Sequence, residues 1–339
     1  MANNLKDVLE LLISPAQSAF IPNRFISDNI YTAHEIFHYI NHKKKGKQKL
    51  LTLKLDMRKA YDRVEWEFID KLLHRFGFAD HWVQMVLSCL RSVSYILMIN
   101  GAMCGKVIPS RGIRQDDPLS LALFILCSQA LSSLLVKAGN EGLLKGIQLA
   151  EVCHLQECLN IYCKASGQAV NLQKSTLSFS PNVHSKFRRW FSQILKVKYD
   201  KGPNKYSGLP TSFGTSKAKL FQEISAKAGK HFDGWKNHLL SHAAKEIMMK
   251  SVAFSLSNYA SSHFKLPASH HSHLKRTTTN LFWGDGSDKK KIHWISWFRL
   301  CLSKQKGGLG FRDPTLYNKV EISWRQRWAQ TPLGRGGVF

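Results

Sequence analysis

The sequence predicts an α+β fold, and three observations support this. Two β-type runs, "LTLKLD" and the hairpin pattern "VSYILMINGAMCGKVIP", are separated by segments whose apolar residues recur every three or four positions. Strands and helices alternate irregularly, which is typical of α+β domains. Beyond residue 180 the pattern changes to long basic helices. We therefore predict a mixed domain over residues 1–180 and a mainly helical region over residues 181–339.

The first half of the mixed domain contains three predicted helices and one strand. Ser27 and Asp28 are candidate caps for a helix through "NIYTAHEIFHYINH". The apolar alternation that follows predicts a strand ending at Asp56. Gly77 closes a helical pattern, "EWEFIDKLLHRF", and Asp80 opens the next, "HWVQMVLSCLRS". We expect these last two helices to pack on the sheet that contains the first strand.

Turn residues divide the rest of the chain. Asn100-Gly101 is the typical turn of a two-residue β-hairpin. The polar loop "RGIRQDDPLS" then opens the apolar helix "LALFILCSQALSSLLVKAG". In the second region we expect basic helices over "TSKAKLFQEISAKAGKHFDGWKNHLL" and "SHAAKEIMMKSVAFSLSNYASSHF", a break at Pro267, and a Trp-rich module that ends in "KGGLGF".

The charge of the chain indicates an anionic partner. It carries 49 Lys and Arg against 23 Asp and Glu, a net charge of +26, spread along the sequence. Such an excess favours a polyanion, and nucleic acid is the partner that we expect.

The seven cysteines are odd in number and lack paired short spacings, so we expect free thiols in a reducing compartment. We see no run of about 20 apolar residues that would span a membrane and no secretory signal pattern. We therefore expect no membrane association and an intracellular location, in the nucleus or the cytoplasm. The oligomeric state is left open.

Asp56, with Tyr61 and Asp62 after it, forms the first candidate site. A carboxylate at the end of a strand is a suitable metal ligand, but metal-assisted nucleotidyl transfer requires more than one. The alternative is that Asp56 only caps the following turn.

Two basic loops are further candidates. Arg111 and Arg114 precede a helix N-terminus, where amides and the helix dipole favour anions. The alternative is a solvated loop with Asp117-Pro118 as a plain helix start. Lys174 follows a turn in "SGQAVNLQKS" and is either an anion-binding residue or a solvated surface lysine.

Six segments of the chain resemble motifs of one protein family, and they occur in the same order as in that family. They are "QSAFIPNRFISDN", "KLDMRKAYDRVEW", "NGAMCGKVIPSRGIRQDDPLS", "SGQAVNLQKS", "KYSGLPTSFGTSK" and "KKKIHWISWFRLCLSKQKGGLGFRD", and the chain is similar to reverse transcriptases of plant non-LTR retrotransposons. The resemblance implies an RNA-directed DNA polymerase of the right-hand type. It would have fingers, a palm on a ferredoxin-like sheet, a helical thumb and a connection region. It also implies Mg²⁺ as cofactor, and RNA template, DNA primer and deoxynucleoside triphosphates as partners.

The resemblance also implies roles for single residues. Asp56 matches the first metal-binding carboxylate, and Tyr61 matches the aromatic residue under the incoming sugar. Arg114, Gln115 and Pro118 match the loop that packs on the template and the nascent base pair. The resemblance further gives Lys174 as the lysine that approaches the triphosphate, Arg24 as a fingers arginine near template or triphosphate, and Gly208 as the glycine of the primer-grip turn.

The chain departs from the family at three places. The hairpin that carries Ala-Asp-Asp is absent, because "GLLKGIQLA" runs directly into "EVCHLQECLNIYCKASGQ". Asp116 stands where the family has glycine, and Ser207 replaces the leucine of a Tyr-Leu-Gly turn. Since two of the three carboxylates are missing, we expect metal binding and nucleotidyl transfer to be lost, the palm sheet to be weakened, and nucleic-acid binding to be retained.

Two alternatives remain. The chain is a non-enzymatic, basic nucleic-acid-binding remnant, or it is an active polymerase whose missing hairpin is an artefact of the gene model.

Overall fold

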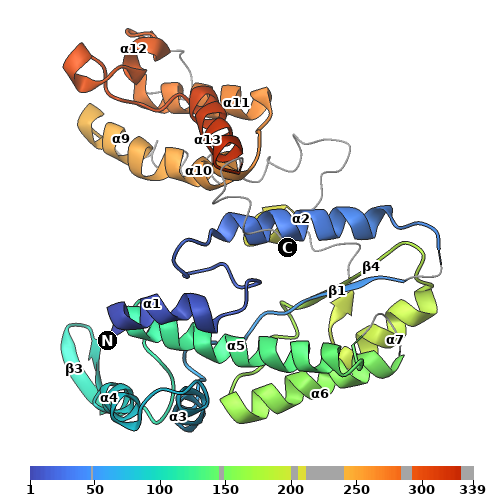
Figure 1. Cartoon of the computed structure of the whole chain (residues 1–339). Coiled ribbons are helices and arrows are strands. Elements are labelled where there is room, and N and C mark those ends of the chain that lie inside the picture. The colour runs from blue at the N-terminus through green and yellow to red at the C-terminus, as the bar shows by residue number, and fades with distance from the viewer. Residues whose placement is uncertain (47–48, 145–148, 200–204, 211–239, 284–291, 330–339) are drawn as a thin grey trace. The chain divides into compact units, whose positions relative to one another are not determined.

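The computed structural model describes the chain except for residues 47–48, 145–148, 200–204, 211–239, 284–291 and 330–339 (Figure 1). The chain divides into two compact units, Met1–Ser212 and Phe213–Phe339. Each is described by itself below.

The first unit combines helices with short strands. Its helices are α1 (Ala2–Leu12), α2 (Ile26–His42), α3 (Trp66–Arg75), α4 (Asp80–Arg91), α5 (Pro118–Asn140), α6 (Leu149–Ser166) and α7 (Ser185–Leu195). Its strands are β1 (Leu51–Lys54), β2 (Tyr95–Ile99), β3 (Ala102–Val107), β4 (Thr176–Phe179), β5 (Lys198–Tyr199), β6 (Lys205–Tyr206) and β7 (Leu209–Pro210).

The strand that precedes Asp56 lies at the edge of a small sheet with the order β1-β4-β5. β1 pairs antiparallel with β4, Leu53 opposite Leu177, and β4 pairs parallel with β5. The sheet packs on α6 and α7 through Val152, Phe191 and Leu195, among others. Within the described residues β1 therefore has one strand neighbour, and its other edge is unpaired by strands.

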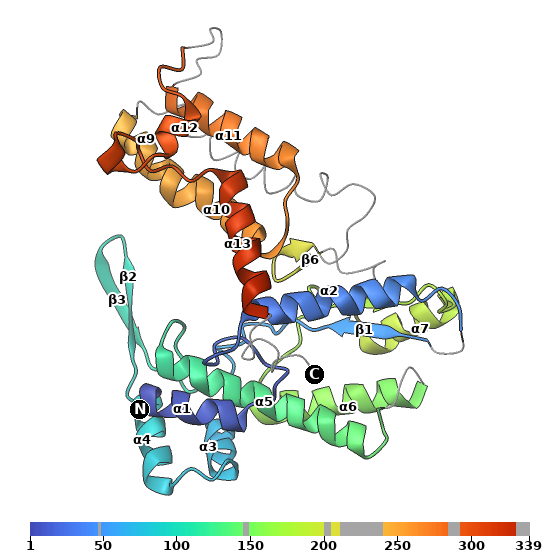
Figure 2. The ribbon, with the colours of Figure 1, turned by 45° about the horizontal axis from the view of Figure 1, so that its top comes forward.

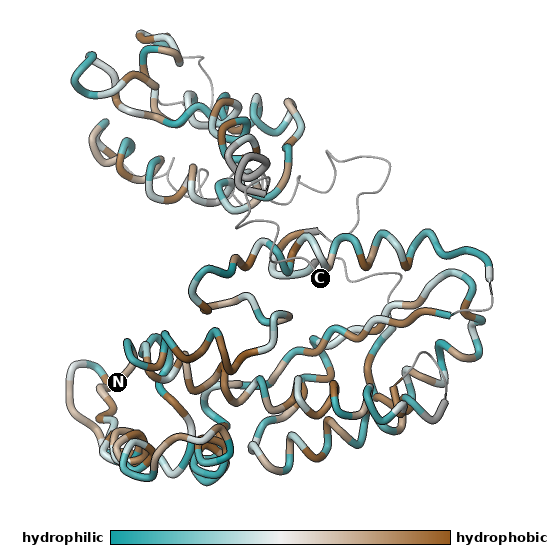
Figure 3. Tube along the Cα trace, viewed as in Figure 1, coloured by the Kyte–Doolittle hydropathy of each residue, from teal (hydrophilic) through white to brown (hydrophobic). Residues whose placement is uncertain are grey.

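The main core of the first unit lies between helices, and this corrects one expectation. Buried residues of α1, α3, α4 and α5, including Leu9, Leu73, Leu87 and Leu126, form one apolar cluster. Figure 3 shows these helices with apolar positions along them. The prediction that α3 and α4 pack on the β1 sheet is wrong. The reason is that the long α5, apolar around its circumference, supplies their partner surface.

Helix α5 has the length and apolar composition of a membrane span, so the expectation that the sequence contains no such run is wrong; it is the one such helix in the described part of the chain. Several of its side chains, including Leu123 and Leu126, are buried against the neighbouring helices. The same composition is expected for the central helix of a helical core.

Strands β2 and β3 form the predicted hairpin, whose two strands extend away from α4 and α5 (Figure 2). Asn100 and Gly101 both have positive φ, at 50° and 83°, as the two-residue turn requires. All residues of both strands are exposed, Ile96 and Met98 among them.

The helix starts agree only in part with the predicted caps. Asp117 caps α5, accepting a 2.7 Å hydrogen bond from the Ser120 backbone N–H. The predicted caps of α2 are wrong, because α2 begins at Ile26, three residues before the predicted start at Asn29, and Ser27 and Asp28 lie in its first turn. Gly77 ends α3 with a φ of 84°, as predicted.

The second unit is helical in its described part. It contains α9 (His242–Met248), a π-helical turn (Met249–Ala253), α10 (Phe254–His263), α11 (Ala268–Trp283), α12 (Trp297–Cys301), a 3₁₀ turn (Lys304–Lys306) and α13 (Pro314–Ala329). Pro267 separates α10 from α11, as predicted. Its core joins Met249, Leu281, Trp297, Leu300 and Phe311, among others.

The α+β class is confirmed, whereas the right-hand polymerase arrangement remains a prediction. Residues 181–212 lie with the first unit, so the structural division falls further along the chain than the predicted boundary after residue 180. The predicted basic helix over residues 215–240 lies almost entirely outside the described residues. All seven cysteines are free thiols, as expected.

Candidate functional site

Asp56 lies just beyond β1, half-buried, and the turn that carries Lys174 holds its backbone on both sides. The Asp56 N–H donates to Ser175 Oγ at 3.0 Å, and its C=O accepts from the Asn171 N–H at 2.7 Å. Lys174 is exposed, and its own N–H donates to the Asn171 C=O at 3.1 Å. Two predicted site residues from distant sequence segments are thus brought to one turn.

The segment from Arg58 to Trp66 is enclosed by two other motif segments. On one side lies the loop Arg111–Ile113, and on the other lies the turn from Ser166 to Ala169. Three hydrogen bonds to backbone C=O groups join the loop to the segment. The donors and acceptors are Gly112 N–H to Val64 C=O (2.8 Å), Ile113 N–H to Tyr61 C=O (3.0 Å) and Trp66 Nε1 to Gly112 C=O (2.7 Å).

Four hydrogen bonds to backbone C=O groups join the turn to the segment. Two come from backbone groups, Glu65 N–H to Ser166 C=O (3.0 Å) and Arg58 N–H to Ala169 C=O (2.8 Å). Two come from side chains, Arg63 Nε to Gly167 C=O (2.9 Å) and Gln168 Nε2 to Ala60 C=O (2.6 Å). Hydrogen bonds to backbone carbonyls, from backbone N–H groups and from three side chains, therefore join the three predicted motifs into one assembly.

Two glycines permit this close approach. A Cβ on Gly112 would lie 2.9 Å from the Asp62 carbonyl oxygen, and one on Gly167 would lie 2.5 Å from the Arg63 carbonyl oxygen. Both have positive φ, 89° and 73°. Any other residue at either position would meet backbone on the enclosed segment and adopt a strained conformation.

Tyr61, a residue of the enclosed segment, packs against α5. Its ring stacks on Phe124 with 4.6 Å between the ring centroids and 18° between the planes. Burial raises the pKa of the Tyr61 hydroxyl, and the negative charge of Asp116 raises it further. Asp116 thus lies close enough to Tyr61 to influence its charge.

Asp116 itself has a φ of 62°. This is the left-handed region, in which glycine is free of strain and Asp is among the better tolerated alternatives. The positive φ at this position therefore explains why the resemblance implies a glycine here. Ser207, the other predicted departure, also has positive φ, at 47°, next to Gly208 at 79°.

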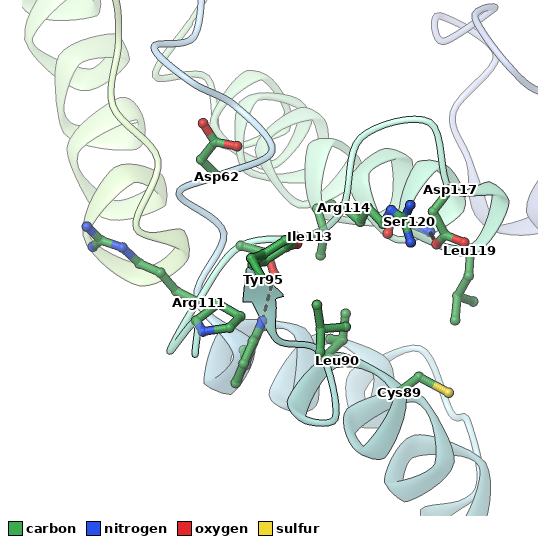
Figure 4. A pocket seen from close by; sticks show the side chains of 14 residues that line it. Asp62, Cys89, Leu90, Tyr95, Arg111, Ile113, Arg114, Asp117, Leu119 and Ser120 are labelled. Carbon is green, nitrogen blue, oxygen red and sulfur yellow. Dashed lines mark hydrogen bonds between the residues drawn. The ribbon is translucent and has the colours of Figure 1, made fainter. Parts of the chain in front are cut away.

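The loop before α5 lines a pocket of about 450 Å³ (Figure 4). In that view Arg111 and Arg114 lie on opposite sides of it, and Asp117 and Ser120 lie beside Arg114. Arg111 Nη1 pairs with Glu65 Oε1 at 3.2 Å. The apolar lining of the pocket includes Leu90, Tyr95, Ile113 and Leu119. Arg114, Gln115 and Pro118 are exposed beside it, so the predicted loop forms a surface with basic and apolar groups.

Arg24 is occupied by the chain itself. Its guanidinium donates to the backbone C=O groups of Ser14 (2.6 Å), Gln17 (2.8 Å), Ile13 (3.1 Å) and Glu10 (3.3 Å). These carbonyls lie at the end of α1 and just after it, where unpaired C=O groups favour a cation. Arg24 therefore fixes the connection between α1 and α2, and its predicted role near template or triphosphate remains a prediction.

The carboxylates needed for a magnesium centre do not gather around Asp56. Within the described residues no group of three or more His, Cys, Asp or Glu could hold a metal ion. Asp117 is used as a helix cap. A two-ion centre requires several hard, charged oxygen ligands, so the residues present do not fit one.

Comparisons with known proteins concern the first part of the chain. Residues 1–154 match the family model described as reverse transcriptase (RNA-dependent DNA polymerase). This part of the chain is therefore similar in sequence to reverse transcriptases. All of the enclosed segment and the loop before α5 fall within this match, whereas Lys174 lies after it.

Three curated relatives extend the comparison. The chain is 27% identical over 218 residues to the transposon TX1 uncharacterized 149 kDa protein of Xenopus laevis, covering 57% of this chain and 16% of that protein. It is 32% identical over 108 residues to a putative ribonuclease H protein of Arabidopsis thaliana, covering 31% and 17%. It is 29% identical over 87 residues to the Pol polyprotein of a type-1 retrotransposable element R2 of Popillia japonica, covering 26% and 14%. The chain thus spans less than a fifth of each of these three relatives, two of which are proteins of transposable elements.

Sequence reasoning missed the residues that hold the assembly together. Gly112, Gly167 and Gln168 stood inside quoted motifs but received no role. The usable signal was that both glycines lie in quoted motifs outside a predicted helix, where close backbone approach or positive φ is the usual reason for glycine.

Proposed function

We propose that this chain is part of a plant non-LTR retrotransposon protein whose reverse transcriptase domain binds an RNA template and a DNA primer but no longer transfers nucleotides. The observation that carries the proposal is the position of Asp56. It stands at the end of a strand that has one strand neighbour, in an assembly of three motifs that resemble those of reverse transcriptases, and within the described residues the further carboxylates that the chemistry requires do not gather there.

The order of elements supports loss of a hairpin. A ferredoxin-like unit runs βαββαβ. Here β1, α5, α6 and β4 follow in that order, α5 and α6 pack together, and β1 pairs with β4. The two middle strands of such a unit would fall between α5 and α6, where the sequence has only residues 141–148. The same gap is where the Ala-Asp-Asp hairpin is expected.

Template and primer binding would rest on the loop before α5 and on distributed charge. In this proposal Arg114, Gln115 and Pro118 lie against the template and nascent pair, Tyr61 lies under the incoming sugar, and Lys174 faces the triphosphate. The net charge of +26 supports affinity for a polyanion. Three curated relatives in Arabidopsis thaliana support the plant assignment.

Binding and catalysis are tested separately. Fluorescence anisotropy with a labelled RNA/DNA hybrid is expected to show binding that weakens steeply as salt rises. Arg114→Gln should reduce both the affinity and the salt slope, the latter by about one charge. Arg75→Gln removes the same charge from an exposed position at the end of α3 and is the matched control. Equal effects of the two variants would contradict a specific role for the loop.

Primer extension on an oligo(dT)-primed RNA template with Mg²⁺ or Mn²⁺ is expected to yield no product. Robust synthesis that Asp56→Asn abolishes would overturn the loss of activity. Sequencing the transcript across the codons for Ala150 and Glu151 tests the gene-model alternative, which predicts additional coding sequence there. Binding that does not distinguish the hybrid from any other polyanion would favour the basic remnant instead.

A further inference from the structure

The segment Ile292–Arg299 carries bulky side chains on the surface of the second unit. Trp294 is 77% exposed, Phe298 is 74% exposed and Ile292 is 69% exposed. Large apolar side chains gathered at this density on a surface usually mark a contact site. Trp294 differs in this from Trp297, three residues later, which is buried.

The exposed residues lie on a segment that is attached to the core of the second unit. Trp297 is only 9% exposed, and its Nε1 donates to Asp313 Oδ2 at 2.9 Å. Leu300 is buried in the core, and its C=O accepts from both the Leu309 and Phe311 N–H groups at 3.1 Å. Trp294 and Phe298 are thus held on a short helix and its lead-in, both attached to the core, rather than on a free loop.

Charge around the segment favours an anion. Arg299, Lys304 and Lys306 are exposed in or just after it. Of the nearby acids, Glu246 is paired with Lys250 and Lys304, at 2.7 Å and 3.0 Å. Asp313 caps α13 and accepts from Trp297. Within the described residues these two carboxylates are therefore engaged inside the unit, whereas Arg299 and Lys306 are exposed cations close in sequence to the aromatic residues.

We propose that Trp294 and Phe298 form a stacking platform for single-stranded nucleic acid, with Arg299 and Lys306 binding its phosphates. Unpaired bases stack on exposed aromatic rings while a basic surface follows the backbone. A duplex buries its base faces, so the platform discriminates single strands from duplexes. The site lies in the second unit, outside the segment that matches reverse transcriptases, and the inference does not depend on the proposed function of the Asp56 assembly.

The test uses the full chain and a labelled mixed-sequence RNA of about 16 nucleotides, the upper end of known site sizes. The double variant Trp294→Ala/Phe298→Ala is expected to lose between about 5-fold and 100-fold in affinity for the single strand, corresponding to one or two lost stacked bases. Affinity for a duplex of the same sequence should stay unchanged. Single-stranded DNA of that sequence should respond like the RNA, because stacking does not read the sugar.

Two further variants separate stacking from folding. Trp294→Phe keeps an aromatic face and should retain most of the affinity. Leu316→Ala/Val320→Ala removes two other exposed apolar side chains, from α13, and should leave binding unchanged. The proposal is overturned by unchanged single-strand affinity in the double variant, by equal loss for duplex and single strand, or by failure of Trp294→Phe to bind. It is also overturned if the double variant abolishes self-association without altering RNA binding, since the surface would then join two copies of the chain. These binding measurements are independent of the primer-extension assay, so a failure of this proposal would not affect the proposed loss of nucleotidyl transfer.

Discussion

Gly167 lies against the backbone of Arg63 so closely that a Cβ on residue 167 would be 2.5 Å from the Arg63 carbonyl oxygen. The Gly167 C=O in turn accepts a 2.9 Å hydrogen bond from Arg63 Nε. Residues more than 100 positions apart, in two different motifs, are joined by this contact. The enclosed segment that follows Asp56 depends on it.

Gly167→Ala is therefore expected to be strongly destabilising. The new Cβ meets backbone rather than the end of a flexible side chain, and the φ of 73° adds strain. We expect a loss of about 2–4 kcal/mol in the free energy of unfolding of the first unit, measured by urea denaturation. Gly77→Ala is the matched control, because φ there is 84° but nothing lies within 4 Å of the new Cβ. It should cost only about 1 kcal/mol. Similar losses in the two variants would show that the close approach is not important.

The start of α5 gives a second prediction. Asp117→Ala removes the acceptor for the Ser120 N–H and should cost about 1 kcal/mol in the free energy of unfolding. Asp117→Asn retains an amide oxygen that can cap the helix and should lie close to the unmodified chain in the same urea titration. If Asn destabilises as much as Ala, the carboxylate charge rather than the cap is responsible.

Gly77, Asp117 and Gly167 show how much of the structure could be predicted from the sequence. Short-range signals were sufficient for the Asn100-Gly101 hairpin, the end of α3 at Gly77 and the start of α5, because each is decided by local backbone conformation. The packing of α3 and α4 was wrong because an apolar helix face fits a sheet and a helix equally well. The contact between Gly167 and Arg63 was missed because it depends on tertiary structure. The buried state of Trp297 and the exposure of Trp294 likewise cannot be read from composition.

The proximity of Asp116 to Tyr61 predicts a measurable electrostatic effect. The carboxylate disfavours the Tyr61 phenolate, so Asp116→Asn should lower the pKa of Tyr61. Burial, the larger cause, remains, and the pKa should stay above its usual value. The difference in phenolate absorbance between each chain and its Tyr61→Phe counterpart reports this titration. Asp80→Asn, a change at an exposed carboxylate on α4, is the control and should leave the Tyr61 titration unaltered.

His270 predicts an acid-sensitive second unit. Burial, with smaller contributions from the charges of His271 and His273, lowers the pKa of His270 to about 4. The unfolded chain, whose histidines titrate near about 6.5, therefore binds more protons than the folded chain between these values. The stability contributed by neutral His270 is fully present above about pH 6.5 and declines as the pH falls towards 4. His270→Gln should reduce this decline in urea titrations at pH 7 and pH 5, whereas the same substitution at exposed His293 should not. Equal pH dependence with and without His270 would contradict the assignment.

Asp56 gives the last prediction, on metal binding. One carboxylate in a chain of net charge +26 supplies too little negative charge to hold two divalent ions. Electron paramagnetic resonance of free Mn²⁺ should therefore give the same titration for the unmodified chain, for Asp56→Asn and for Asp80→Asn, whose side chain is exposed. Any weak binding to surface carboxylates should be equal in the three chains and suppressed by salt. Saturable Mn²⁺ binding that Asp56→Asn removes and Asp80→Asn retains would mean that other ligands converge on Asp56. The retained first carboxylate would then belong to a working metal centre, and the proposed loss of nucleotidyl transfer would have to be abandoned.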